Sequence, residues 1–204
     1  GKHADACVQW LGNKDKSFDR AALLADKDGD LTGRMLAKYG QHVGLVISGE
    51  ILDAIEISRD MLQLADARPG SPWARLIALR QFASAGYMAG RLAESEEALL
   101  EVVAAKRDME QAPPGFAHDP YVTAHSTLSH IEWALGCPGH ALRRSADNLA
   151  TLNLEASNPN TVSHTLIWRM FLALFCRRED LSVGPRKQLV NHTRRSLGTF
   201  WGHI

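Results

Sequence analysis

Apolar residues recur every three or four positions along most of the chain, which is the spacing of one face of an α-helix. Within residues 51–65, for example, Ile51, Ala54 and Ile55 fall on one stripe while Asp53 falls outside it. No stretch shows a sustained alternation of apolar and polar residues, which would be typical of a β-strand. The pattern therefore predicts an all-α fold.

Three segments share a glycine that is followed five residues later by a small residue. They are Gly49-Glu-Ile-Leu-Asp-Ala54, Gly90-Arg-Leu-Ala-Glu-Ser95 and Gly136-Cys-Pro-Gly-His-Ala141. A glycine can adopt the left-handed conformation that closes a helix, and a small residue lets the next helix pack closely. We therefore expect three tight turns, each joining two helices.

A second signal alternates with the glycine turns. Ser71-Pro72, Asp119-Pro120 and Asn158-Pro159 each place an N-cap residue before a proline suited to the first helical position. The alternation of glycine turns with N-cap–proline pairs predicts that the helices are arranged in pairs. The predicted helices are 3–11, 17–26, 33–47, 50–67, 72–89, 92–109, 120–135, 138–155, 159–177 and a last one from Gly184 to about residue 197.

These pairs predict a right-handed stack of antiparallel helical hairpins, an α-solenoid of tetratricopeptide type, over residues 33–204. The hairpins are longer than the usual repeat of about 34 residues, which we attribute to long connecting loops. Residues 1–32 are expected to form a separate N-terminal helical segment. Both ends look cut, since the chain starts at Gly1 and stops at Ile204, so we expect a repeat array that is incomplete at its C-terminal end.

Composition and charge narrow the function classes. The 204 residues are 45% hydrophobic and 23% charged, which excludes a disordered chain. The 23 Lys and Arg residues balance the 23 Asp and Glu residues, which argues against a nucleic-acid partner. Three well-separated cysteines fit free thiols in a reducing cytoplasm. The most apolar stretch, Ile167 to Cys176, is too short to span a membrane.

One block of the sequence resembles a known family. The matching residues are Asp119, Pro120, Val122, Ala124, Leu128, Trp133, Leu135, Gly136, Pro138, Ala141 and Leu142. The block is similar to the tetratricopeptide-like region of bacterial multidomain signalling proteins, namely class III adenylate cyclases and related regulators that carry a predicted ATPase. The resemblance extends over about residues 35–180. It implies a sensory or scaffolding part of a larger protein, because the chain has no phosphate-binding loop and no cyclase domain.

Three candidate chemical sites have simpler structural explanations. Asp26-Lys-Asp-Gly-Asp30 starts like an EF-hand loop, but Leu31 stands where the loop needs glycine and Ala37 where it needs glutamate. His118, His125, His130 and His140 cluster around one hairpin, yet their spacing matches no zinc motif. Cys137 lies near His140 without a third group to orient that histidine. We therefore expect no enzyme activity, no metal and no cofactor.

The C-terminal region is basic, with Arg177, Arg178, Arg186, Lys187, Arg194 and Arg195 against Glu179 and Asp180. We interpret this as the solvated face of a terminal helix. An acidic partner or a nucleic acid is the alternative.

The leading hypothesis is a non-catalytic module that binds a protein or peptide on the surface formed by the first helix of each hairpin. Candidate partner-binding residues are the polar positions of these helices: Arg80, Ser84, His125, Ser129, Glu132, Thr165 and Arg169. The alternative is a regulatory fragment of a larger adenylate cyclase or ATPase-type regulator, whose catalytic domain lies outside this chain. Self-association through an exposed repeat end is also expected to be possible.

Overall fold

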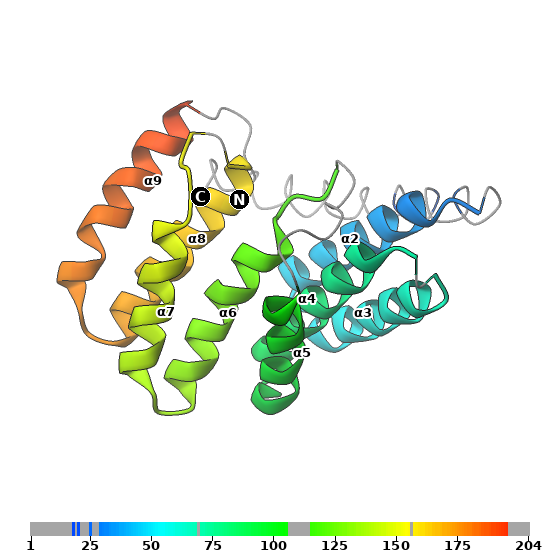
Figure 1. Ribbon diagram of the computed structural model, residues 1–204, viewed down its shortest axis with the longest axis horizontal. Coiled ribbons are helices and arrows are strands. Elements are labelled where there is room, and N and C mark those ends of the chain that lie inside the picture. Colours follow the sequence, from blue (N-terminus) through cyan, green and yellow to red (C-terminus); the bar gives the residue numbers. More distant parts are fainter. Residues whose placement is uncertain are drawn as a thin grey trace, which may run out of the picture. The chain divides into compact units, whose positions relative to one another are not determined.

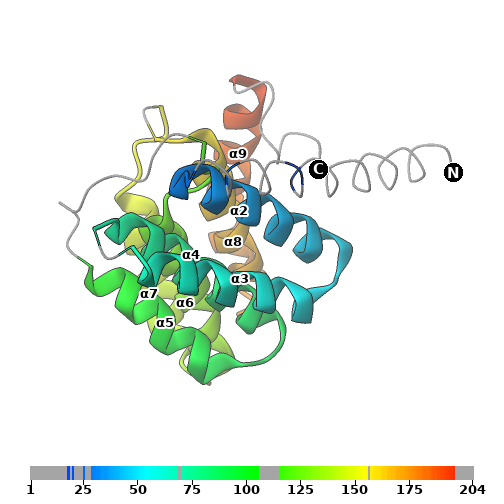
Figure 2. The same ribbon diagram turned by 90° about the vertical axis from the view of Figure 1, so that its right-hand side faces the viewer.

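The computed structural model describes residues 18, 20, 25, 29–68, 70–105, 115–155 and 157–195, and every regular element in these residues is a helix (Figures 1 and 2). The helices are α2 (Leu31–Ser48), α3 (Ile51–Asp66), α4 (Pro72–Met88), α5 (Leu92–Ala104), α6 (Pro120–Ala134), α7 (Pro138–Ala150), α8 (Pro159–Phe175), the 3-10 turn η1 (Glu179–Leu181) and α9 (Val183–Arg195). The all-α prediction is confirmed. We call α2, α4, α6 and α8 the A helices, and α3, α5, α7 and α9 the B helices. No described helix is both long and apolar enough to cross a bilayer.

The chain divides into two compact units. The first comprises Gly1–Ser95 with Lys106–Phe116, and the second comprises Glu96–Ala105 with Ala117–Ile204. In the first unit α3 packs against both α2 and α4. In the second unit α8 packs against α6, α7 and α9, and α6 and α7 form an antiparallel pair (Figure 1). The predicted boundary at residue 32 stays a prediction.

The glycine turns have the backbone conformation that the sequence predicts. Gly49, Gly90 and Gly136 all lie in the left-handed region, with φ of 83°, 76° and 86°. At each turn the amide of the next residue donates to a carbonyl five positions back, for example Arg91 N to Gly86 O at 2.8 Å. These bonds satisfy carbonyl groups that the helix end leaves without a partner. The small residue five positions after each glycine is fully buried, as Ala54 illustrates.

A fourth turn of the same kind follows α8, and it contains no glycine. Arg177 takes the left-handed conformation, with φ of 54°. The flanking bonds repeat those of the other turns, with Arg178 N donating to Ala173 O at 2.8 Å and Arg177 N to Leu174 O at 2.9 Å. The Cβ atom of arginine makes this conformation unfavourable, because it lies too close to the following carbonyl oxygen. Arg177 is therefore the structural equivalent of three glycines.

Two of the three predicted N-cap residues form capping hydrogen bonds with their side chains. The Asp119 carboxylate accepts bonds from the amides of Tyr121 (2.8 Å) and Val122 (3.1 Å). The Asn158 side chain accepts equivalent bonds at the start of α8, from Asn160 at 2.9 Å and Thr161 at 3.3 Å. Ser71 occupies the N-cap position of α4, but its side chain accepts no capping bond.

Most predicted helix ends agree with the structure to within two residues, and α5 and α7 are the exceptions. Helix α5 stops at Ala104, whereas the sequence predicts a helix to residue 109. Helix α7 stops at Ala150, whereas the sequence predicts a helix to residue 155. The side chain of Asn153 accepts a bond from the amide of Glu155 at 3.0 Å, and this local turn competes with helix continuation. The predicted helix 3–11 lies outside the described residues. Within 17–26 the described residues 18, 20 and 25 are helical.

Small and apolar side chains build the interior of the first unit. Ala54, Ile55 and Ala85 are buried together, and Leu45 and Phe82 pack against them. Phe116 is also buried in this unit. Its ring lies 5.4 Å from that of Tyr39 and 5.7 Å from that of Trp73, measured between centroids.

Candidate interaction surface

Four of the seven predicted surface residues are buried, which corrects the expectation that they face solvent. Arg80 and Ser84 are each 7% exposed, Thr165 is 2% exposed and Ser129 is 1% exposed. The hydroxyl of Ser129 donates to Ser126 O at 2.7 Å, and that of Thr165 donates to Thr161 O at 2.9 Å. A helical hydroxyl can thus be satisfied by its own backbone, so polar identity alone does not imply exposure.

Arg80 is held in a buried network in the first unit. Its guanidinium donates to Oε1 of Gln81, and the Gln81 amide donates to Nδ1 of His42 at 2.9 Å. Nε2 of His42 then donates to the Gln81 carbonyl at 3.1 Å. Burial and the nearby Arg80 charge lower the pKa of His42 to about 3. The network holds α2 against α4 and is part of the interior.

The other three predicted residues are partly exposed and lie in the second unit. Arg144 of α7 donates from Nε to Glu132 Oε1 at 2.8 Å and from Nη1 to His125 Nδ1 at 3.2 Å. Arg169 donates to the Leu142 carbonyl at 3.2 Å. The structure thus brings His125 and Glu132 together through Arg144, which the sequence reasoning did not select. A partner-binding role for all seven residues stays a prediction.

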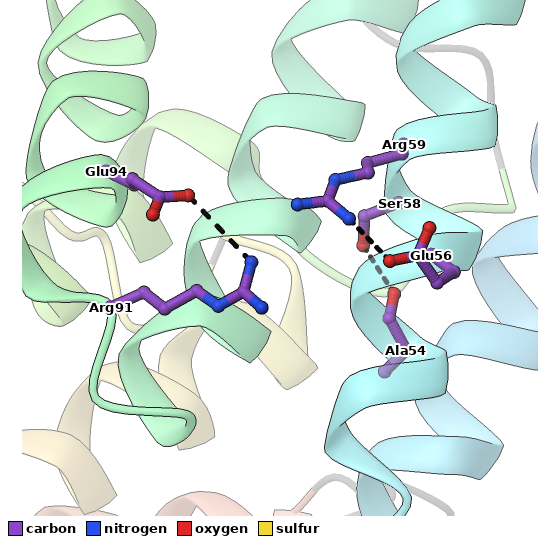
Figure 3. Close-up of polar contacts among 6 residues, drawn as sticks. All are labelled: Ala54, Glu56, Ser58, Arg59, Arg91 and Glu94. Atoms are coloured by element: carbon purple, nitrogen blue, oxygen red, sulfur yellow. Dashed lines mark hydrogen bonds and ion pairs between the residues drawn. The ribbon is translucent and has the colours of Figure 1, made fainter.

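The first unit also has charged pairs on its surface (Figure 3). Arg59 pairs with Glu56 on α3, and Arg91 lies 4.0 Å from Glu94 at the start of α5. The Arg59 guanidinium also lies over the Phe82 ring, 6.0 Å from its centroid. Each of these arginines already has a carboxylate partner on the protein surface. Such exposed pairs contribute little to stability.

The candidate chemical sites do not assemble in the described residues. No group of three potential metal ligands occurs among them. Of the histidine cluster, His130 is buried and donates from Nε2 to the Trp168 carbonyl at 2.8 Å, while His140 is exposed. Cys137 is exposed at the turn between α6 and α7. The EF-hand-like segment lies largely outside the described residues, which include only Gly29 and Asp30 of it.

Exposed apolar side chains recur on the A helices, and the sequence reasoning missed them. Counted back from each left-handed turn residue, position −2 holds Ile47 (43% exposed), Met88 (47%), Ala134 and Phe175 (42%). Position −3 holds Val46, Tyr87, Trp133 and Leu174, and the last of these is 58% exposed. Aligning the four turns would have revealed this register, but the fourth turn lacks the glycine that marks the others.

In the second unit, exposed apolar side chains form a cluster around Phe175. The Phe175 ring stacks on Trp133 with centroids 4.8 Å apart, and Phe171 lies 6.4 Å from Phe175. The His130 ring makes an edge contact with the Phe175 ring, with centroids 5.7 Å apart, and it also packs against the Trp168 ring, with centroids 4.5 Å apart. Burial lowers the pKa of His130 to about 4, so the His130 side chain beside these rings is uncharged at neutral pH. We call Trp133, Phe171, Leu174 and Phe175 the Phe175 surface.

Comparisons with known proteins identify the fold. No family model and no curated protein matches the sequence. Among solved structures, the chain is similar to a kinesin light chain-like protein of Podosopora anserina that has nearly identical TPR-like repeats. A single-substitution variant of that protein has a TM-score of 0.57 to this chain at 16% sequence identity. The match covers 91% of this chain and 89% of that chain. A second structure of that kinesin light chain-like protein gives 0.51 at 14% identity, covering 90% and 97%. The chain therefore has the fold of TPR-like helical repeats.

Proposed function

We propose that the chain is a non-catalytic module that binds a protein or peptide through its A helices. The observation that carries this proposal is the register of the exposed apolar side chains. Of the ten large apolar residues that are exposed in the described part of the chain, five lie two to six positions before a left-handed turn: Ile47, Met88, Phe171, Leu174 and Phe175. Exposed apolar groups that cluster at equivalent positions are typical of interaction surfaces.

The geometry supports this proposal over catalysis. Two buried polar arrangements have a structural role: His42 bonds to Gln81, and Asn148 bonds to the backbone of Val122. Both arrangements tie one helix to the next. TPR-like repeats in general expose a long face on one set of helices, which suits a peptide or a domain as partner.

Peptide selection with matched variants tests the function. A displayed peptide library is panned against the purified chain, and the enriched peptides are tested against Met88→Asp and Leu174→Asp. We expect at least one variant to lose binding at unchanged helicity. Leu52→Asp, on the B helix α3 and 64% exposed, is the control and should retain binding. Binding that survives both A-helix variants, or is lost equally in the control, contradicts the proposal.

Placement within a bacterial signalling protein is the finer part of the proposal. It rests on the block from Asp119 to Leu142, which resembles the repeat region of class III adenylate cyclases and related ATPase-containing regulators. In that setting the partner is a domain of the same parent chain, acting in the cytoplasm. Sequencing the gene on both sides of this segment tests it. A neighbouring cyclase or phosphate-loop ATPase domain supports the placement, and a reading frame without one contradicts it.

A further inference from the structure

We propose that the Phe175 surface binds an acidic, apolar peptide segment and that Arg177 receives one of its carboxylates. This inference rests on the proposed function and specifies the chemistry of the partner. Three observations support it: the apolar surface is exposed, its aromatic rings are held in place, and unpaired positive charge adjoins it.

The apolar part of the surface is large and preorganised. The last two turns of α8 carry three exposed apolar side chains: Phe171 (50% exposed), Leu174 (58%) and Phe175 (42%). Stacking on Trp133 and an edge contact with His130 fix the Phe175 ring from two sides. Rings that are already ordered lose little conformational entropy on binding, and aromatic side chains are frequent anchors at interfaces.

The segment that carries Phe171 and Phe175 has an excess of positive charge, which favours an acidic partner. The chain from Pro159 to Arg194 carries six Lys and Arg residues against two Asp and Glu residues. One of those two acids, Asp180, is already bonded by Arg178 at 2.8 Å and 2.9 Å. Glu132, on α6 beside Trp133, is bonded by Arg144. The charge that remains unpaired along the segment from Pro159 to Arg194 is therefore mainly positive.

Among the described residues, Arg177 is a cation without an ion pair that lies close in sequence to the Phe175 surface. It is exposed, two residues beyond Phe175, and it forms no ion pair with any residue in the described part of the chain. It also occupies a left-handed position that glycine fills at the three equivalent turns. An unfavourable backbone conformation beside an exposed surface points to a role for the side chain at that position. A carboxylate from the partner supplies that role, because arginine binds carboxylates with two parallel hydrogen bonds.

Three synthetic peptides test the proposal. Each has about twelve residues with the same Leu and Phe positions, and the intervening residues are Glu in the first, Gln in the second and Lys in the third. Fluorescence anisotropy measures their binding to the purified chain at low and high salt. We expect the Glu peptide to bind at least about tenfold more tightly than the Lys peptide, with a difference that shrinks as salt screens the charges. Equal binding of the two, or no binding of the Glu peptide, overturns the proposal.

Variants of Arg177 separate charge from folding. Arg177→Gly removes the guanidinium while relieving the backbone, so it should weaken Glu-peptide binding about fivefold to tenfold without lowering thermal stability. Arg177→Lys should retain most of the binding. The control is Arg143→Gln, which removes an exposed arginine from α7 and should leave binding unchanged. Unaltered binding in Arg177→Gly overturns the assignment of this residue.

Two further outcomes are informative. Sedimentation equilibrium tests whether a second copy of the chain covers the surface: a dimer that Leu174→Asp converts to monomer overturns the peptide proposal. The library selection described above judges the function separately. If the selected peptides lose binding to Leu174→Asp but contain no excess of acidic residues, the interaction function stands and the acidic partner is wrong.

Discussion

His42 and Gln81, which are 39 residues apart, are joined by two hydrogen bonds that fix the histidine in one neutral tautomer. The Gln81 carbonyl can only accept, so Nε2 of His42 carries the proton and Nδ1 accepts from the Gln81 amide. Arg80 bonds the amide oxygen of Gln81 and so sets the orientation of that amide. A second proton on His42 would break the bond at Nδ1 and place a charge beside Arg80.

The neutral state of His42 predicts that acid destabilises the fold. Its folded-state pKa of about 3 lies below the ordinary value of 6.5, so between these values the unfolded chain binds a proton that the folded chain does not. Stability is therefore fully present above pH 6.5 and decreases as the pH falls towards 3. We expect His42 to account for a loss of roughly 2 kcal/mol between about pH 7 and pH 4.5.

Urea unfolding of His42→Gln at the two pH values checks this. The variant should lose much of the pH dependence, because glutamine does not titrate. His140→Gln, which removes an exposed histidine from α7, should keep the pH dependence of the parent. A His42→Gln variant with the full acid sensitivity would assign the effect to other groups, such as the buried His130.

Replacing Arg177 by glycine should stabilise the protein. Left-handed backbone costs a residue with a side chain about 1 kcal/mol relative to glycine, so we expect Arg177→Gly to gain about that much. Gly136→Ala makes the opposite change at an equivalent turn and should lose a similar amount. Thermal unfolding of both variants gives the comparison. A stability loss in Arg177→Gly would mean that the arginine side chain stabilises the fold by more than the turn costs.

Gly86 and Ser95 should show a strong energetic coupling. A Cβ at Gly86 would lie 2.5 Å from the Ser95 hydroxyl oxygen but 3.8 Å from its Cβ. Gly86→Ala alone should therefore cost about 1–2 kcal/mol despite the higher helix propensity of alanine. Ser95→Ala alone should be close to neutral, since this buried hydroxyl has no hydrogen-bond partner.

The double variant Gly86→Ala with Ser95→Ala decides the cause. Without the oxygen, the two methyl groups would meet at an ordinary contact distance, so stability should return to that of the parent or exceed it. Chemical denaturation of all four proteins completes the cycle. Simple additivity of the two changes would show that the hydroxyl is not the obstacle.

Asn148 should be intolerant of aspartate. Its buried amide donates to Val122 O at 2.9 Å and to Ser126 Oγ at 3.1 Å, which connects α7 to α6. Asn148→Asp has the same shape but no donor while ionised, so we expect a loss of about 2–3 kcal/mol at neutral pH. Relative to the parent, the variant should recover part of this at low pH, where a protonated carboxyl can donate. Asp147→Asn, an exposed change at the neighbouring position, serves as control in the same urea titrations.

The order and ends of the helices could be predicted because they depend on local chemistry. Gly49 and Gly136 provide left-handed turns, and Asp119 and Asn158 supply capping oxygens, so each signal lies within a few residues of its effect. The turn at Arg177 could not be predicted in this way. Its left-handed backbone runs against the preference of arginine, so no local signal in the sequence marks it.

The surface was harder to predict than the fold. Polar identity suggested that Ser129 and Thr165 face solvent, yet both hydroxyls are satisfied by their own helix and are buried. Conversely, Leu174 and Phe175 fit an apolar stripe and would be assigned to the interior, yet both are exposed. Which face of a helix a neighbour covers depends on contacts between distant segments, and periodicity alone does not encode it.

In the three hairpins from α2 to α7, the connections at one end are short and those at the other end are long. Their connections from A helix to B helix have two or three residues, all of them used by the turn, whereas the connections from B helix to the next A helix have five, fifteen and eight. An epitope tag or a spectroscopic label therefore has room between α7 and α8, at residues 151–158. The same insertion at 135–137 would break the bond from Cys137 N to Glu132 O and shift the register of α7 against α6. Length variation is thus confined to one end of each of these hairpins, and natural insertions and deletions should accumulate there.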